Sequence, residues 1–245
     1  YRKNQDNAGY LQAAGLYYEL SEIMERENKD MIVNMLYVRS SLERANESRR
    51  EMEAVNVKLL KQSETDQMTG LANRYRLNDY SDKVLDYCYE HRLPLAMEIL
   101  DIDFFKQYND NYGHQQGDEC IITIADELKK MEDGQTFCAR YGGDEFIIIY
   151  AGISAEEVHA KAAALRQNIM DLKLEHLYSN ALPIVTISQG ISYGVPEEGN
   201  RSWDFLHTAD MLLYQVKKKS RNDICIADIR GQELDLSSKQ EKVEP

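Results

Sequence analysis

The stretch Ala139-Arg-Tyr-Gly-Gly-Asp-Glu-Phe-Ile-Ile-Ile-Tyr150 sets two glycines and two adjacent carboxylates between segments that favour strands. The flanking aromatic and β-branched residues are typical of paired strands, and Gly142 and Gly143 can adopt the positive φ of a tight turn. The stretch therefore predicts a β-hairpin. Asp144 and Glu145 stand where its second strand should begin to bury apolar side chains, so a structural role alone does not explain them.

A second pair of acids follows another predicted strand. The segment Leu93–Leu100, LPLAMEIL, leads directly into Asp101-Ile102-Asp103. If the hairpin lies beside this strand, Asp101 meets the acids of the turn, and a cluster of three carboxylates is stable only when cations neutralise it. The alternative for Asp101 is an Asx turn that closes the strand. For the adjacent acids of the hairpin such an alternative is weaker, because a plain hairpin turn favours Asn-Gly.

The oxygen ligands and the overall charge narrow the choice of cofactor and partner. Carboxylate oxygens suit a hard cation, so we expect Mg²⁺, with Mn²⁺ as the alternative, and substrate phosphate oxygens can complete such a shell. The net charge of −13 and the pI near 4.9 would repel a nucleic-acid backbone. We therefore expect no nucleic-acid partner and an anionic substrate that binds through the metal.

Helices and strands alternate after the first quarter of the chain. Apolar periodicity and capping residues predict helices at 74–91, 114–131, 154–173 and 203–219, and strands at 93–100, 184–192 and 223–227 beside the hairpin. This order predicts an α/β (α+β) fold in which a mixed sheet is flanked by helices. The chain has 245 residues and is 43% apolar, which suffices for one core and a further segment.

Several features bear on the compartment. No uncharged apolar run approaches the length of a membrane span, and the four cysteines form no CxxC pair. We therefore expect a cytoplasmic domain with reduced thiols and no direct membrane contact. The chain opens on Tyr1 rather than Met, so we expect it to belong to a longer protein, which could be tethered to a membrane elsewhere and carry a sensor domain before this residue.

Residues 1–62 have the composition of a long helix. From Tyr10 to Leu60 there is no proline and the only glycine is Gly15. A heptad seam can be written through Met31, Met35, Val38, Leu42, Ala45, Arg49, Met52, Asn56 and Leu59. This pattern predicts a coiled coil that joins two chains as a homodimer. The alternative is a helix that packs on a preceding domain, and upstream of about Asp30 the two interpretations are equally favoured.

Several motifs occur in order between Ser63 and Ala227. They are Asp66-x-Met-Thr-Gly-Leu-x-Asn-Arg74, Asp101-Ile-Asp-Phe-Phe-Lys-x-Tyr-Asn-Asp110, Gly113-His-x-x-Gly-Asp118, Arg140-Tyr-Gly-Gly-Asp-Glu-Phe146, Thr186-x-Ser-x-Gly190 and Ala209-Asp-x-x-Leu-Tyr214, followed by Lys217 and Arg221-Asn222. Together they resemble the GGDEF family of diguanylate cyclases. The resemblance implies a palm-like fold related to nucleotidyl cyclases and polymerases, and the dimeric condensation of two GTP into cyclic di-GMP with release of pyrophosphate.

The resemblance also divides the chain. It implies a catalytic domain at 63–228, preceded by the helical signalling segment at 1–62. The polar tail at 229–245 is expected to be disordered. The alternative function is a non-catalytic module that binds GTP or cyclic di-GMP as a receptor, but the intact acids of the motifs favour the enzyme.

The resemblance assigns the metal ligands. Asp101, the backbone carbonyl of Ile102 and Asp144 would hold Mg²⁺ in a two-metal site, with Glu145 supporting them. Asp144 is also the proposed proton acceptor of the family, although a metal ligand makes a poor base.

The resemblance assigns phosphate binding to three basic residues. Lys106, Lys217 and Arg221 match these positions, and Lys106 is counted with the catalytic residues. Without the motifs around them, all three would be interpreted as solvated surface charges. Gly142 and Gly143 lack a Cβ and let the backbone approach phosphate closely.

Base selection is assigned to Asn109, His114 and Asp118. An Asn amide and a carboxylate can pair with the N1-H and N2-H₂ edge of guanine, which adenine does not reproduce. Taken alone, His114 would be interpreted as a helix cap or packing residue. One departure from the family is the stretch Asp133-Gly-Gln-Thr136, which replaces the Arg-x-x-Asp of a product-binding inhibitory site. We therefore predict no feedback inhibition through this stretch.

Overall fold

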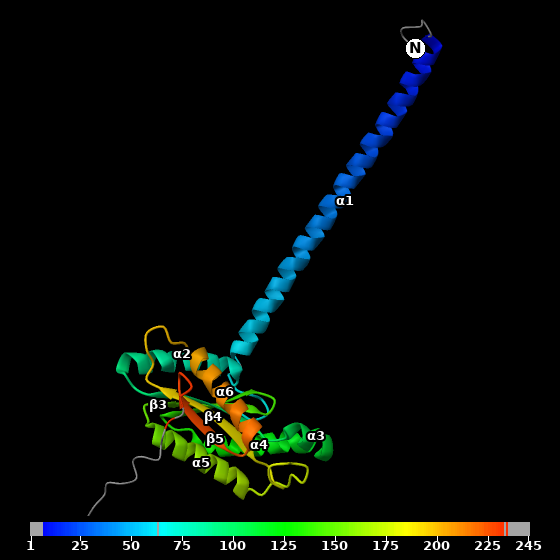
Figure 1. The fold of residues 1–245 in the computed structure, drawn as a ribbon. Coiled ribbons are helices and arrows are strands. Elements are labelled where there is room, and N and C mark those ends of the chain that lie inside the picture. The colour runs from blue at the N-terminus through cyan, green and yellow to red at the C-terminus, as the bar shows by residue number, and fades with distance from the viewer. Residues whose placement is uncertain (1–6, 63, 233, 235–245) are drawn as a thin grey trace, which may run out of the picture. The chain divides into compact units, whose positions relative to one another are not determined.

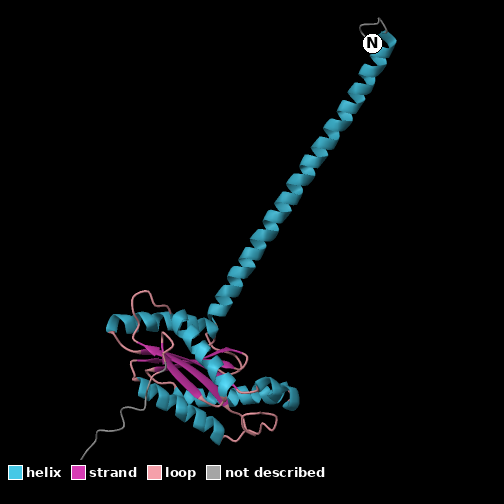
Figure 2. Cartoon of the chain, in the orientation of Figure 1, coloured by secondary structure: helices cyan, strands magenta, loops and turns pink. Residues whose placement is uncertain are grey.

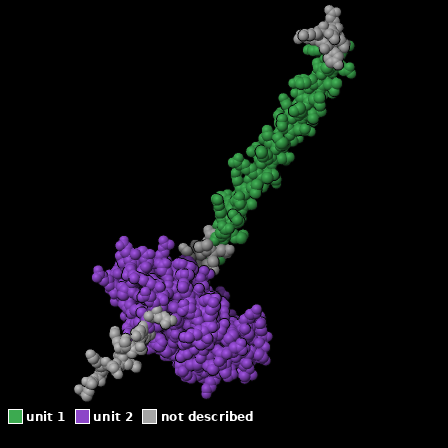
Figure 3. Space-filling view, viewed as in Figure 1, with its two compact units in different colours: residues 1–60 green, residues 61–245 purple. Residues whose placement is uncertain are grey.

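The computed structural model describes residues 7–62, 64–232 and 234, and it divides the chain into two compact units, residues 1–60 and 61–245 (Figure 3). Most of the predicted polar tail therefore lies outside the described residues, and the domain boundaries at 62 and 228 stay predictions. Within the described part, no helix is both long enough and apolar enough to cross a bilayer.

The first unit is a single helix, α1, over Asn7–Gln62 (Figure 2). Its apolar seam side chains are exposed to solvent, including Met35 at 72% and Leu42 at 58%. The side chain of Asn56 is not among those described, so its predicted place in the seam is not tested. A helix with an uncovered apolar stripe gains little stability from packing, because most helical stability in proteins comes from burying such a stripe.

The second unit is built on a five-stranded sheet with the order β2-β3-β1-β4-β5. The strands are β1 at Leu95–Ile102, β2 at Thr136–Gly142, β3 at Glu145–Ala151, β4 at Ile187–Gly194 and β5 at Ile224–Asp228. All neighbours are antiparallel except β4 and β5, which are parallel. The sheet is mixed, as predicted.

Helices cover both faces of this sheet (Figure 1). They are α2 at Arg74–His91, α3 at Phe105–Tyr112, α4 at His114–Met131, α5 at Ala155–Asp171 and α6 at Ser202–Lys219. Alternate residues of β3 enter different cores. Ile148 and Tyr150 pack with residues of α4 and α5, whereas Ile147 and Ile149 pack with residues of α2 and α6. The continuous apolar run of the hairpin is therefore buried on both sides.

The predicted helix at 114–131 is confirmed, and so is the capping box of α5, in which Ser154 and Glu157 pair reciprocally. The strand expected at 184–192 lies later, at Ile187–Gly194, because Ile184 joins only an isolated bridge to Glu175. The sequence did not predict α3, an eight-residue helix whose buried residues are Phe105 and Tyr108.

One glycine determines how closely α6 approaches the sheet. Gly190 of β4 lies so near α6 that a Cβ placed on it would overlap the backbone at Ala209 and Leu213. Backbone atoms cannot shift as easily as a flexible side chain, so the close approach depends on glycine. The C-terminal half of α6, which carries Lys217, is seated on the sheet by this contact.

Candidate active site

The pairing of β1 with β3 brings the predicted acids to one end of the sheet. Asp101, near the end of β1, lies opposite Glu145, the first residue of β3, in the antiparallel register. Asp144 belongs to the preceding hairpin turn, where Gly143 has φ of 54°. The predicted meeting of two strand ends is therefore present in the fold.

Arg140 holds this turn in shape. Its guanidinium Nε and Nη2 donate to the carbonyl of Gly143 at 3.1 and 2.8 Å. Its Nη1 forms an ion pair with Asp66 at 3.1 Å, and Asp66 also accepts from the backbone and hydroxyl of Thr69. The segment before α2 is thus tied to the hairpin, so residues of the first and fourth motifs are in contact.

Asp101 and Glu145, at this end of the sheet, have raised pKa values. The pKa of Asp101 is raised to about 6, chiefly by burial and also by the charges of Asp144 and Glu145, while Lys217 opposes the shift. Burial likewise raises the pKa of Glu145. Lys217 Nζ lies 2.7 Å from Asp101 Oδ2 and offsets part of the negative charge of the group. Carboxylates that repel one another in a half-buried site suit a divalent cation.

The acids are not gathered into a finished coordination sphere. Among the described residues, no three side chains of His, Cys, Asp or Glu lie close enough together to hold a metal ion as they stand. The donor set is nevertheless chemically suitable, because Asp101, Asp144 and Glu145 offer only oxygen atoms. Their assignment as ligands, together with the carbonyl of Ile102, stays a prediction.

Asp103 is a hub of hydrogen bonds that our sequence analysis assigned no role. Its fully buried carboxylate accepts from the hydroxyls of Thr186 and Ser188 at 2.8 and 2.7 Å, and from the backbone N–H of Asn222 at 2.9 Å. Arg221 Nη1 lies 3.4 Å away. Asp103 and these partners belong to three different motifs, so the joint presence of the motifs in the sequence was the available signal.

The predicted base-selecting residues lie on α3 and α4. Asn109 packs under Gly117 so closely that a Cβ at Gly117 would overlap its amide, so this glycine makes room for the asparagine. The buried Oδ1 of Asn109 has no hydrogen-bond partner within the described part of the chain. Asp118 directly follows Gly117 and is exposed, as are His114 and Lys106. No described ion pair joins Lys106 or His114 to the acids.

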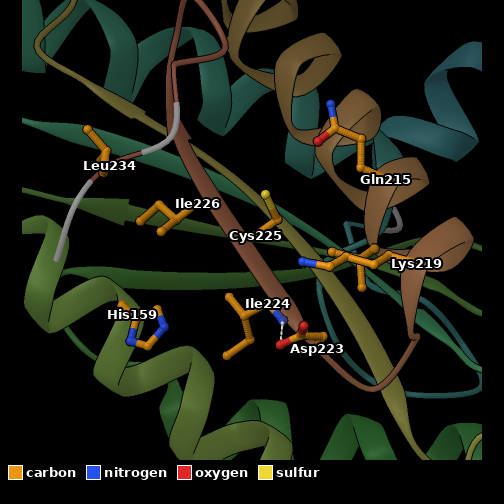
Figure 4. Close-up of a pocket in the computed structure, with 9 residues that line it drawn as sticks. His159, Gln215, Lys219, Asp223, Ile224, Cys225, Ile226 and Leu234 are labelled. Carbon is orange, nitrogen blue, oxygen red and sulfur yellow. Dashed lines mark hydrogen bonds between the residues drawn. The ribbon is translucent and has the colours of Figure 1, made fainter. Parts of the chain in front are cut away.

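A cavity of about 310 Å³ lies elsewhere, beside the edge strand β5 (Figure 4). Its lining includes Lys219, Asp223 and His159, and the Asp223 carboxylate accepts from the backbone N–H of Ile224 at 2.9 Å. None of the predicted site residues lines this cavity, so it is separate from the acid cluster.

Residues 63–223 match the family model described as the diguanylate cyclase GGDEF domain. The chain is 34% identical over 163 residues to the probable diguanylate cyclase DgcC of Escherichia coli (strain K12), which covers 65% of this chain and 42% of that protein. It is 31% identical over 179 residues to diguanylate cyclase A of Treponema denticola, covering 70% of this chain and 46% of that protein. The chain thus spans less than half the length of these relatives.

Solved structures agree on the fold. The GGDEF domain of DgcB from Caulobacter crescentus, in complex with c-di-GMP, superposes with a TM-score of 0.61 at 31% identity over 66% of this chain and 92% of that chain. The coiled coil and GGDEF domain of the same protein superpose with a TM-score of 0.62 at 29% identity over 75% of this chain and 97% of that chain.

Proposed function

Because this chain belongs to the GGDEF family of diguanylate cyclases, we propose that it condenses two molecules of GTP into cyclic di-GMP and releases two pyrophosphates. The observation that carries the proposal is the strand register that sets Asp101 opposite Glu145 and beside the hairpin turn with Asp144. Carboxylates concentrated at one sheet end, with Lys217 against them, match the needs of phosphoryl transfer, in which charge must be balanced around phosphate oxygens.

Asp101, Asp144 and Glu145, with the carbonyl of Ile102, would hold the divalent cation, which we propose to be Mg²⁺, with Mn²⁺ as the alternative. When bound in a two-metal arrangement, such ions activate the attacking 3′-hydroxyl and stabilise the departing pyrophosphate. The raised pKa of Asp101 supports this role, because a carboxyl group destabilised by burial and by like charges gains most from a cation. Asp144, nearest the turn, is the proposed proton acceptor.

The basic residues would bind the phosphates. Lys217 has an ammonium group already oriented toward the acids, and Arg221 is held by Asp103 with its side chain only partly exposed. A guanidinium fixed in this way loses little conformational freedom when it binds phosphate. Lys106, on the first turn of α3, would complete the set, and Gly142 and Gly143 would admit the triphosphate near the hairpin backbone.

Guanine would be read at α3 and α4. The unpartnered Oδ1 of Asn109 supports this, because a buried acceptor without a donor costs free energy that a ligand N–H can recover. Asp118 would accept from the N1-H and N2-H₂ edge, and His114 would line the same side. The base edge of adenine lacks these donors, so GTP would be preferred.

The active species would be a homodimer. The product is two-fold symmetric and each domain would bind one GTP, so two domains must meet. The exposed seam of α1 would supply the parallel coiled coil that keeps them at high effective concentration.

The test is to incubate the purified chain with GTP and Mg²⁺ and to identify the products by mass spectrometry. We expect cyclic di-GMP and pyrophosphate from the unaltered chain. Asp101→Asn should lower turnover by at least about a thousandfold with the fold unchanged, because the site loses a ligand charge while its acids repel one another less. Nucleotide binding without any product would instead support a non-catalytic receptor module, and turnover of Asp101→Asn near the unaltered rate would overturn the metal assignment.

A further inference from the structure

We propose that His176 is a positioning residue, which holds the turn between β1 and α3 in the conformation that presents the nucleotide-binding side chains. The inference deepens the proposed function and rests on it. It arises from residues 172–185 in the loop between α5 and β4, which lie outside the family motifs. Within this loop His176 is fully buried, although a loop histidine is more often exposed.

The loop folds back on itself as a small hairpin. Glu175 and Ile184 form an antiparallel bridge, and the N–H of Val185 donates to the carbonyl of Leu174 at 2.8 Å. The N–H of His176 donates to the carbonyl of Pro183 at 3.0 Å. The backbone that carries His176 is therefore ordered by its own hydrogen bonds, and its side chain has a defined direction.

Aromatic rings join this loop to α3. The imidazole of His176 meets Tyr108 edge to face at a centroid distance of 5.1 Å, and Tyr112 in a similar geometry at 6.3 Å. The hydroxyl of Tyr112 accepts from the N–H of Leu177 at 3.0 Å. The loop thus braces one side of α3, while the helix carries Lys106 and Asn109 elsewhere on its surface. Edge-to-face contacts between rings have a preferred geometry, so they favour one position of the loop against α3.

The key contact is with the turn itself. His176 Nε2 lies 3.2 Å from the carbonyl oxygen of Phe104, which also accepts from the N–H of Tyr108 at 3.0 Å. Phe104 has φ of 57°, a left-handed conformation that is costly for an aromatic residue and persists only where its surroundings enforce it. Burial lowers the pKa of His176, so the ring is neutral near pH 7 and donates from Nε2 in that tautomer.

Phe104 connects His176 to Arg221, one of the proposed phosphate-binding residues. The guanidinium of Arg221 stacks on the Phe104 ring, with its carbon 4.3 Å from the ring centroid. Arg221 also lies beside the carboxylate of Asp103, the residue before Phe104. A change in the conformation of Phe104 would therefore remove the surface on which Arg221 rests. The path from His176 to Arg221 runs through two contacts and needs no change elsewhere.

Two substitutions at His176 distinguish the contribution of its hydrogen bond to Phe104 from that of its ring contacts. His176→Phe keeps an aromatic ring against Tyr108 and Tyr112 but removes the donor to Phe104. His176→Gln loses the ring and keeps an amide N–H near the position of Nε2. A matched control is Val158→Ala, which opens a cavity on the buried face of α5, an element that contains neither His176 nor the turn, and lowers stability.

The readout is the Kd of a GTP analogue with a methylene group between the α- and β-phosphates, measured by calorimetry alongside thermal unfolding. We expect His176→Phe to raise the Kd about fivefold, the effect of one hydrogen bond. We expect His176→Gln to stay within about twofold of the unaltered chain, and Val158→Ala to lower the unfolding temperature while leaving the Kd unchanged. In an Arg221→Ala background, His176→Phe should add less than about twofold, because both changes affect one path.

An unchanged Kd in His176→Phe, or an equal rise in Val158→Ala, would overturn the proposal. Full additivity of His176→Phe with Arg221→Ala would also overturn it, because the path through Phe104 would then be absent. Since binding is measured without turnover, the outcome is independent of whether the unaltered chain makes cyclic di-GMP, which the product analysis tests separately.

Discussion

The two compact units treat their apolar side chains in opposite ways. In the second unit the large side chains of Phe146, Tyr150 and Phe205 are fully buried between sheet and helices. In α1 the seam side chains of Met35 and Leu42 lie mostly in solvent. The second unit therefore has a core of its own, whereas α1 carries a surface that gains stability only when something covers it. If α1 assembles two chains as proposed, we expect stability and assembly to be alterable separately.

The largest effect is expected when charged residues replace apolar residues of the α1 seam. Leu42→Glu with Met52→Glu should prevent a coiled coil, because carboxylates would be buried against their counterparts in the partner. We expect cyclase activity at nanomolar protein to fall about a thousandfold, since effective concentration is lost, and to recover as the protein concentration rises. Thermal unfolding of the second unit should not change.

The control for the seam uses the same chemistry on the same helix. Val33 and Leu36 are also exposed, at 64% and 60%, but lie off the seam. Val33→Glu with Leu36→Glu should leave activity unchanged at all concentrations. If both pairs of substitutions act alike, or if neither makes activity depend on concentration, α1 does not assemble the active species.

The core of the second unit is not wholly apolar, because it contains a fully buried acid. Glu98 of β1 is fully buried and accepts from the hydroxyl of Tyr150 at 2.8 Å and from Nε2 of Gln189 at 2.7 Å. Burial raises its pKa to about 7. The folded state therefore holds a proton that the unfolded state releases at lower pH, so the free energy of unfolding should decrease as pH rises from about 4.5 to about 7.

The magnitude follows from the raised pKa. As the pH rises from about 5 to about 7, deprotonation of Glu98 in the unfolded state should lower the free energy of unfolding by about 2 kcal/mol. In Glu98→Gln this contribution should vanish, and the introduced amide can donate to Oε1 of Gln189, which has no partner among the described residues. Urea unfolding of both proteins at the two pH values measures it. Identical pH profiles for the two proteins would show that Glu98 is not protonated in the fold.

A smaller effect is expected at Asp118, which is exposed on the surface of the second unit. Asp118→Ser removes the proposed acceptor for the guanine edge while Asn109, with its buried Oδ1, stays. Discrimination of GTP against ATP should fall about tenfold, the effect of one hydrogen-bonded partner. Competition assays with both nucleotides measure this ratio. An unchanged ratio would place guanine recognition on other residues.

The smallest effect is expected at the stretch that departs from the family. Asp133 pairs with Lys161 at 2.8 Å and accepts from the N–H of Gln135, so both of its oxygens are engaged. Lys161 keeps the pKa of Asp133 low, at about 2, so the carboxylate stays charged and repels phosphate. Added cyclic di-GMP should leave initial rates unchanged in the unaltered chain and in Asp133→Ala alike. Noncompetitive inhibition that Asp133→Ala abolishes would contradict this.

Much of the second unit could be predicted because local and tertiary preferences agree there. The hairpin around Gly142 combines turn residues with strand formers, and α4 begins at its predicted residue. The helix α3 could not be predicted, because its short sequence is rich in Asn and Asp and has weak helical propensity. It forms because Phe105 and Tyr108 are buried against other elements, and a packing contribution of this kind is not visible in a local window.

The candidate site was predictable only where its residues lie in motifs. The meeting of Asp101 with the hairpin acids was predicted on the condition that the two strands pair, whereas the register that sets Asp101 opposite Glu145 is evident only in the fold. The contact of His176 with Phe104 joins positions 72 residues apart and has no pattern of its own. Such a residue appears in the sequence as one of several scattered histidines, and only the fold separates it from the others.

Because α6 packs so closely on the sheet at Gly190, a substitution there offers a way to change the candidate site without replacing any of its residues. Exchanging glycine for alanine ordinarily stiffens the unfolded chain and raises stability. At Gly190 the added carbon would instead press on the backbone at Leu213 and lift the following turn of α6, which carries Lys217. The ammonium would then withdraw from Asp101, so one methyl group could alter the charge balance of the acids without replacing any charged residue.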